Sequence, residues 1–113
     1  MPDRFVLAEP SIVYQEVCGT LARRVSADIA DQARKQLDLI IHPSLVVNCD
    51  RAFCISAYPL CSEYHIYAVD AAYLRVALDH QAVLVSLDKE DFTGRVNSKR
   101  PGIEAYHPTE FPY

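Results

Sequence analysis

Apolar residues recur at helical spacing through the N-terminal part of the chain. The segment from Pro10 to Val25 predicts a helix, because its apolar residues fall one turn apart. These residues are Val13, Val17, Leu21 and Val25. Ser26 is the predicted N-cap of a second helix. The apolar line of that helix consists of Ile29, Ala33 and Leu37.

The middle of the chain combines short apolar runs with two prolines. Leu39-Ile40-Ile41 predicts a short buried strand, which His42-Pro43 ends. A third helix is expected to begin near Pro43-Ser44 and to stop at Pro59, because proline breaks a helix interior. The segment from Leu60 to Ile66 is expected to be a loop.

Helix and strand patterns alternate in the C-terminal half. A fourth helix is predicted from about Ala68 to His80. The run from Ala82 to Leu87 is short, almost entirely apolar and rich in valine, a pattern typical of a strand covered on both faces by helices. It ends at Asp88, and residues 103–106 predict a last, peripheral strand. The sequence therefore predicts an α/β sandwich with a short, largely parallel sheet, in a single domain over residues 1–113.

Composition narrows the class of protein. The 113 residues, half of them hydrophobic, suffice for one domain and leave no room for two. No apolar run approaches the roughly 20 residues that a membrane-spanning helix requires, so no integral membrane protein is expected. Residues 1–4 lack the basic and apolar segments of a secretory signal, so we expect a cytoplasmic protein. The net charge of −4 argues against a protein that coats nucleic acid by bulk charge.

The four cysteines support two interpretations. In a cytoplasmic protein they are expected to be reduced thiols that pack as small apolar groups. Alternatively, Cys49, Cys54, Cys61 and His65 have a spacing compatible with a CCCH zinc finger, whose ligands suit tetrahedral zinc. The residues between these ligands favour helix over a glycine-rich knuckle, which argues against zinc.

Acidic residues occupy positions where a surface charge is not the obvious choice. Glu16 lies at the edge of the first apolar stripe, and Asp70 lies in the first turn of the fourth helix. Asp88 ends the buried strand, where parallel sheets present ligand-binding residues, and Asp91 follows in the next loop. Each acid alone is also compatible with a solvated surface position or a helix-dipole contact. Gathered in one pocket, they would suit Mg²⁺ or Mn²⁺, which prefer oxygen ligands.

Around these acids the chain resembles a known nuclease family. Residues 69–77 (VDAAYLRVA) and 82–92 (AVLVSLDKEDF) resemble, in order and spacing, the signature of PIN domains, the nuclease fold of VapC-type toxins and several RNA-processing enzymes. Residues 10–21 resemble the family's helix that carries its second acid, and residues 102–111 resemble its closing strand and tail. The resemblance covers nearly the whole chain and is most specific over residues 69–92.

The resemblance implies a three-layer α/β/α fold and a metal site. Glu16, Asp70 and Asp88 occupy the positions of the family's acids, with Asp91 as a further metal ligand. Ser86 takes the place of the hydroxyl residue that precedes the final acid, and would orient a ligand or water. The family's opening strand, with its first metal-binding Asp, has no counterpart in these residues. The resemblance therefore implies a PIN-like domain shortened at its N-terminus.

These features favour one function and leave two alternatives. The favoured function is an Mg²⁺- or Mn²⁺-dependent endoribonuclease that cleaves single-stranded RNA with a metal-activated water. Four basic residues would line its phosphate path, namely Lys89, Arg95, Lys99 and Arg100. The first alternative is a non-catalytic PIN-like scaffold, completed by homodimerisation or by another chain. The second is the CCCH zinc module as an RNA-binding protein. Because the family includes toxins, a small antitoxin protein is an expected partner.

Overall fold

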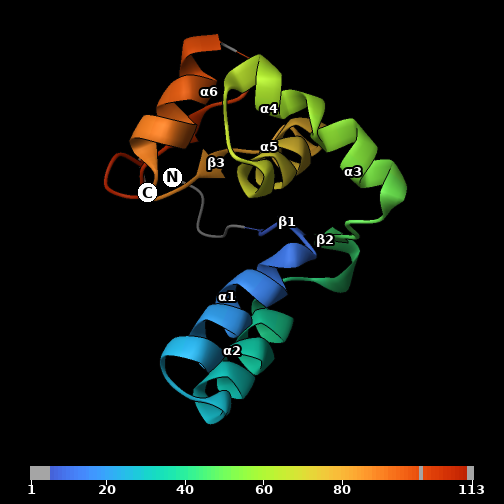
Figure 1. Cartoon of the computed structure of the whole chain (residues 1–113), viewed down its shortest axis with the longest axis vertical. Helices are drawn as coiled ribbons and strands as arrows, with labels where there is room; N and C mark the ends of the chain where they lie inside the picture. Colours follow the sequence, from blue (N-terminus) through green and yellow to red (C-terminus); the bar gives the residue numbers. More distant parts are fainter. Residues whose placement is uncertain (1–5, 100, 112–113) are drawn as a thin grey trace. The chain divides into compact units, whose positions relative to one another are not determined.

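The computed structural model describes residues 6–99 and 101–111. It shows a mixed α/β chain that is mostly helical and has short parallel strands (Figure 1). The chain divides into two compact units, an N-terminal unit over Pro2–Cys49 and a C-terminal unit over Asp50–Tyr113, and each is described by itself. No helix within the described ranges is long and apolar enough to cross a membrane.

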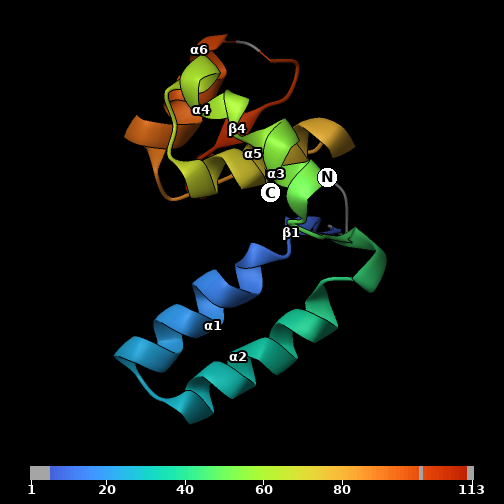
Figure 2. The ribbon, with the colours of Figure 1, turned by 45° about the vertical axis from the view of Figure 1, so that its right-hand side comes forward.

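The N-terminal unit consists of a helical hairpin and a two-stranded parallel sheet. The hairpin is formed by α1 (Ile12–Arg24) and α2 (Ala27–Ile40), which lie alongside each other (Figure 2). The sheet pairs β1 (Glu9–Pro10) with β2 (Val46–Val47). The predicted N-cap of α2 is confirmed, because the Ser26 Oγ accepts a hydrogen bond from the Ile29 N–H at 3.1 Å.

The predicted strand over Leu39–Ile41 is wrong. Leu39 and Ile40 form the last turn of α2, and the Ile41 N–H donates to the Leu37 carbonyl oxygen at 3.0 Å. Three consecutive apolar residues are as compatible with the end of a helix as with a short strand, so the local pattern does not distinguish the two structures. Of the three residues only Ile41 is buried, and the strand of this region forms later, at β2.

Pro43 and Pro59 each begin a helical turn. The third helix does not start at Pro43, which opens a single 3₁₀ turn (Pro43–Leu45) instead. That helix, α3 (Arg51–Ala57), begins after Asp50, whose Oδ1 accepts the Phe53 N–H at 2.9 Å. The expected loop from Leu60 to Ile66 is also largely wrong, because α4 (Pro59–Tyr64) starts at Pro59. Proline is compatible with a first helical turn, since its missing N–H has no partner there.

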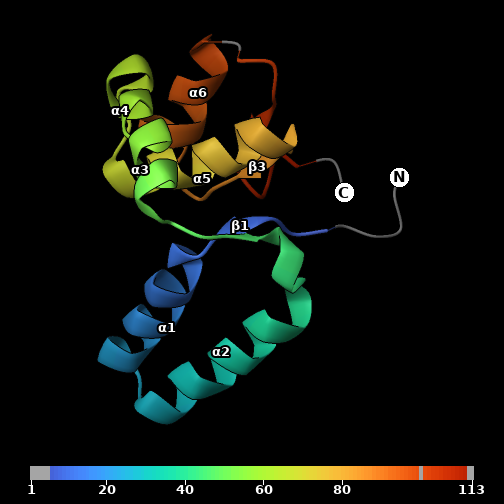
Figure 3. The same ribbon diagram turned by 90° about the vertical axis from the view of Figure 1, so that its right-hand side faces the viewer.

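The C-terminal unit contains the larger apolar core. The predicted fourth helix is confirmed as α5 (Ala68–His80), which packs against α3 and α4 (Figure 3). The two later strands, β3 (Leu84–Val85) and β4 (Ala105–Tyr106), pair in parallel. Between them lie a π-helical turn, η2 (Lys89–Thr93), and α6 (Gly94–Lys99). The core consists of Leu60, Tyr64, Ile66, Ala71, Leu74, Ala77, Leu84, Phe92, Val96 and Ala105.

The strand β3 departs from its predicted environment. Leu84 is buried in the core, as expected. Its neighbours on the other face are exposed, with Val83 at 47%, Val85 at 44% and Leu87 at 80%. The expectation that helices cover both faces of this strand is therefore wrong for the described part of the chain. The parallel direction of the strands is confirmed, and the described residues form two two-stranded sheets.

Candidate functional site

Asp88 organises the segment that follows β3. Its side-chain Oδ1 accepts the Asp91 N–H at 2.9 Å, so it caps the π-helical turn η2. Its own N–H donates to the Ser86 Oγ at 3.2 Å. All three residues are partly buried. The structure therefore brings three of the predicted site residues, Ser86, Asp88 and Asp91, into one hydrogen-bonded turn at the carboxyl end of a parallel strand.

Asp91 is an ion-pair partner of Arg95. The Arg95 Nη2 lies 2.8 Å from the Asp91 Oδ1, one helical turn away. The Arg95 Nη1 also donates to the His65 carbonyl oxygen, so the guanidinium links α6 to the end of α4. Both side chains are more than one-third exposed, and exposed pairs of this kind contribute little to stability. The pairing shows that Arg95 has a local structural role besides any contact with phosphate.

The other predicted basic residues have separate environments. The Lys89 Nζ lies 2.8 Å from the Glu110 Oε2, and this hydrogen bond holds the pKa of the Glu110 carboxyl below its usual value. The His107 N–H also donates to Glu110, at 3.1 Å, and lowers that pKa further. Lys99 is exposed in the last turn of α6. Arg100 lies outside the described residues.

The remaining acids lie on two different helices. Asp70 is partly buried in the first turn of α5, in the same unit as Asp88. Tyr67, at the N-cap of this helix, makes no side-chain capping bond. Glu16 is exposed on α1, in the N-terminal unit. Within residues 6–99 and 101–111, no three or more His, Cys, Asp or Glu side chains form a group that could hold a metal ion.

The residues between the candidate zinc ligands are largely helical, as the sequence indicated. Cys54 is on α3 and Cys61 is on α4, while His65 is the left-handed C-cap of α4 with φ 57°. Cys49 belongs to the N-terminal unit, where its N–H donates to the Ser11 Oγ at 3.0 Å. A zinc knuckle requires a tight turn between its ligands. The segment from Cys54 to Cys61 is instead helical apart from the junction at Tyr58.

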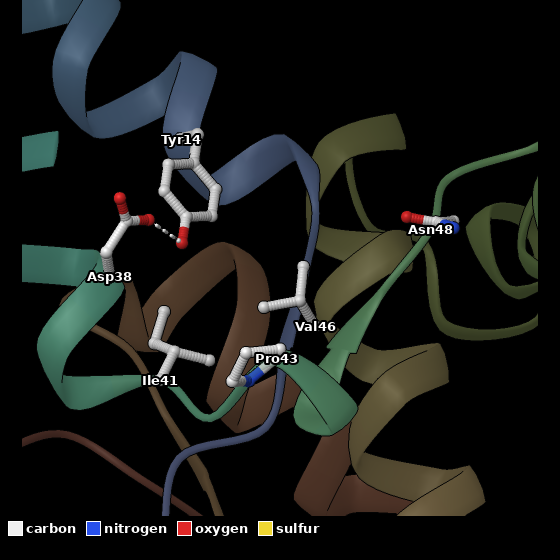
Figure 4. A pocket seen from close by; sticks show the side chains of 6 residues that line it. All are labelled: Tyr14, Asp38, Ile41, Pro43, Val46 and Asn48. Carbon is white, nitrogen blue, oxygen red and sulfur yellow. Dashed lines mark hydrogen bonds between the residues drawn. The ribbon is translucent and has the colours of Figure 1, made fainter.

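A pocket in the N-terminal unit was not foreseen from the sequence. It has a volume of about 350 Å³ and is lined by Tyr14, Asp38, Ile41, Pro43, Val46 and Asn48 (Figure 4). The Tyr14 hydroxyl donates to the Asp38 Oδ1 at 2.7 Å, and this bond raises the pKa of Tyr14. Asp38 also lies 3.4 Å from the Arg34 Nε. The carboxylate therefore ties the two helices of the hairpin together beside a partly apolar pocket.

No local sequence pattern could have identified the hydrogen bond between Tyr14 and Asp38. Tyr14 and Asp38 are 24 positions apart, and each lies in a helix where it fits the surrounding pattern. Their contact follows from the turn around Ser26, which sets the antiparallel course of α1 and α2.

Comparison of the chain with protein-family models, with curated proteins and with solved structures found no match.

Proposed function

We propose that this chain is an Mg²⁺- or Mn²⁺-dependent endoribonuclease of the PIN type that cleaves single-stranded RNA. The observation that carries the proposal is the position of Asp88 after the parallel strand β3, within the turn that it forms with Ser86 and Asp91. In α/β proteins, ligands bind at the carboxyl ends of parallel strands. The proposed fold is a three-layer α/β/α sandwich shortened at its N-terminus, on the strength of the resemblance over residues 69–92.

The donor chemistry of these residues fits a hard cation. Mg²⁺ is usually bound through one or two carboxylates together with waters and substrate phosphates, so a complete cage of protein ligands is not required. Asp70 and Asp88 supply carboxylates from one unit, and Glu16 is the third acid of the proposal. A bound cation would activate a water and offset the charge that develops on the phosphodiester.

The roles of the remaining residues follow from their contacts. Ser86 holds the backbone of Asp88 and would orient a water or a cation ligand. Asp91 is partly neutralised by Arg95, so its contribution to metal binding is expected to be smaller than that of Asp88. Lys99 is exposed at the end of α6 and would contact RNA phosphate. An antitoxin protein is proposed as a partner by the same resemblance.

The test is cleavage of a labelled single-stranded RNA with added Mg²⁺ or Mn²⁺, and with a chelator. Asp70→Asn and Asp88→Asn are expected to lose at least the roughly 10- to 100-fold that removal of an outer-shell partner of a metal ligand causes. Asp79→Asn is the matched control. Asp79 lies on the same helix as Asp70 and forms an exposed ion pair with Arg75, so cleavage should be unchanged.

Three results would contradict the proposal. Cleavage that persists in the chelator would exclude the metal. Equal cleavage by the wild type, Asp70→Asn and Asp88→Asn would exclude these acids. Absence of cleavage by the wild type with every tested single-stranded RNA would exclude the activity itself. Glu16→Gln separately tests whether the acid of the N-terminal unit belongs to the same site.

A further inference from the structure

The pocket of the N-terminal unit combines an apolar surface with one polar pair. Its volume of about 350 Å³ lies near the lower end of the range of small-molecule sites, which begins at about 300 Å³. Ile41, Pro43 and Val46 supply the apolar surface. The Tyr14 hydroxyl and the Asp38 carboxylate meet at one side of the pocket (Figure 4). Apolar walls with a few convergent polar groups are typical of a binding site for a small ligand.

Asp38 gives this pocket a negative charge. The other lining residues in the described part of the chain are uncharged. Asp38 lies in the last turn of α2, and residues 37–40 of that turn include no basic side chain. The last carbonyl groups of a helix carry a partial negative charge, which favours a nearby cation. The carboxylate and the helix end therefore both favour a positively charged ligand.

The polar pair can accept hydrogen bonds from a ligand. The Tyr14 hydroxyl donates its proton to the Asp38 Oδ1 at 2.7 Å, so its oxygen acts as an acceptor towards any further group. A carboxylate offers about four acceptor positions. Tyr14 occupies one of them and Arg34 another, which leaves room for a further donor. The amide of Asn48 can donate, but Figure 4 shows it apart from the pair.

Arg34 leaves the Asp38 carboxylate open to exchange. Its Nε lies 3.4 Å from the Asp38 Oδ2, and the two side chains are 63% and 45% exposed. Exposed ion pairs of this kind are weak, so a ligand cation can displace the arginine at small cost. Arg34 is not among the described residues that line the pocket. An anionic ligand would therefore find the Asp38 carboxylate inside the pocket and the arginine outside it.

We propose that this pocket binds a primary ammonium group carried on a short apolar body. The ammonium donates to the Asp38 carboxylate and to the Tyr14 oxygen, because both accept and the first is charged. The apolar body packs against Ile41, Pro43 and Val46, which removes apolar surface from water. A free alkylamine and a lysine side chain share this chemistry.

Titration of the full chain with n-pentylammonium chloride tests the proposal, with amide chemical shifts in nuclear magnetic resonance as the measurement. Shifts are expected at Tyr14, Asp38, Ile41 and Val46. 1-Pentanol and pentanoate keep the apolar body and change the head group, so both should bind at least about tenfold more weakly. N-acetyl-lysine amide distinguishes the two sources. Binding tighter than that of pentylammonium would assign the pocket to a lysine side chain, and weaker binding would assign it to a free amine.

Three variants separate the charge of Asp38 from its surroundings. Asp38→Asn keeps an acceptor for the Tyr14 hydroxyl but removes the charge, and should weaken ammonium binding at least about tenfold. Arg34→Gln removes the competing cation and should strengthen binding by up to about fivefold. Asp31→Asn is the matched control, because Asp31 is an exposed acid of the same helix about two turns before Asp38. Its affinity should equal that of the wild type.

Several results would overturn the proposal. They are the absence of shifts at the pocket amides, equal binding of 1-pentanol, and preferential binding of pentanoate. Unchanged affinity in Asp38→Asn, or weaker binding in Arg34→Gln, would also overturn it. If Asp38→Asn fails to fold, the three head groups compared on the wild type still test the charge. No RNA enters these measurements, so their outcome is independent of the proposed nuclease activity.

Discussion

Replacing glycine by alanine is expected to have opposite effects on stability at two helical positions, Gly19 and Gly94. Gly19 lies in the middle of α1, where an added Cβ meets no heavy atom within 4 Å. Gly94 begins α6 directly after η2, and a Cβ there would lie 2.8 Å from the Lys89 carbonyl oxygen. We expect Gly19→Ala to stabilise the protein and Gly94→Ala to destabilise it.

The magnitudes follow from these two environments. Replacing glycine by alanine in a helix interior lowers the free energy of the helix by about 1 kcal/mol, because alanine loses less backbone entropy on folding. At Gly19 nothing opposes this gain. At Gly94 the obstructing atom is backbone and also accepts the Gly94 N–H, so η2 has to shift. Such overpacking costs about 1–3 kcal/mol, which leaves a net loss of up to about 2 kcal/mol.

Urea unfolding followed by circular dichroism measures both effects, and hydrogen exchange assigns each to its unit. Gly19→Ala should slow exchange in α1, whereas Gly94→Ala should accelerate exchange in η2 and α6. A Gly94→Ala variant that is stabilised as much as Gly19→Ala would refute the reasoning, since it would mean that η2 shifts without cost. Destabilisation by Gly19→Ala would show that the exposed face of α1 is covered in solution.

Three further changes test other parts of the structure. Leu74→Ala removes a fully buried side chain of α5 and should lower the free energy of unfolding by about 2–5 kcal/mol, measured in urea. Asn97→Ala leaves the two backbone groups of Ala105 without their partner and should cost about 1–3 kcal/mol in the same measurement. Burial raises the pKa of the Glu9 carboxyl, so the stability it confers is present below the ordinary glutamate pKa and lost as the pH rises through the raised value. Glu9→Gln should therefore become more stable relative to wild type as the pH rises, and an unchanged difference across that range would contradict the burial of Glu9.

Elements whose periodicity or capping residue is visible within a short stretch of sequence were predictable. The helix α5 has an apolar periodicity over more than three turns, and Ser26 has the side-chain chemistry of an N-cap. Short runs were not predictable in this way. Leu39 and Ile40 extend α2, and Pro59 opens α4, because the preceding turns already set the backbone direction at these points.

The candidate site was predictable only in part. The sequence indicated Ser86, Asp88 and Asp91 as candidate site residues, and the structure shows that hydrogen bonds join them in one turn. Asp91 forms an ion pair with Arg95, and Lys89 forms one with Glu110. Each pair partly neutralises charges that the sequence suggested for binding metal or phosphate. The second pairing joins residues 21 positions apart, so it depends on the course of the chain from η2 to the C-terminal tail.

The sequence by itself determined the three long helices, α1, α2 and α5, their order, and the acids that follow or begin the later elements, because these depend on periodicity, capping and side-chain chemistry over a few residues. The tertiary structure decided which segments are covered. The run from Ala82 to Leu87 is apolar except for Ser86, yet among the described residues one of its faces is exposed and β3 pairs with a single strand, β4. Burial depends on which distant segments pack against a strand, and the local pattern of the strand does not contain that information.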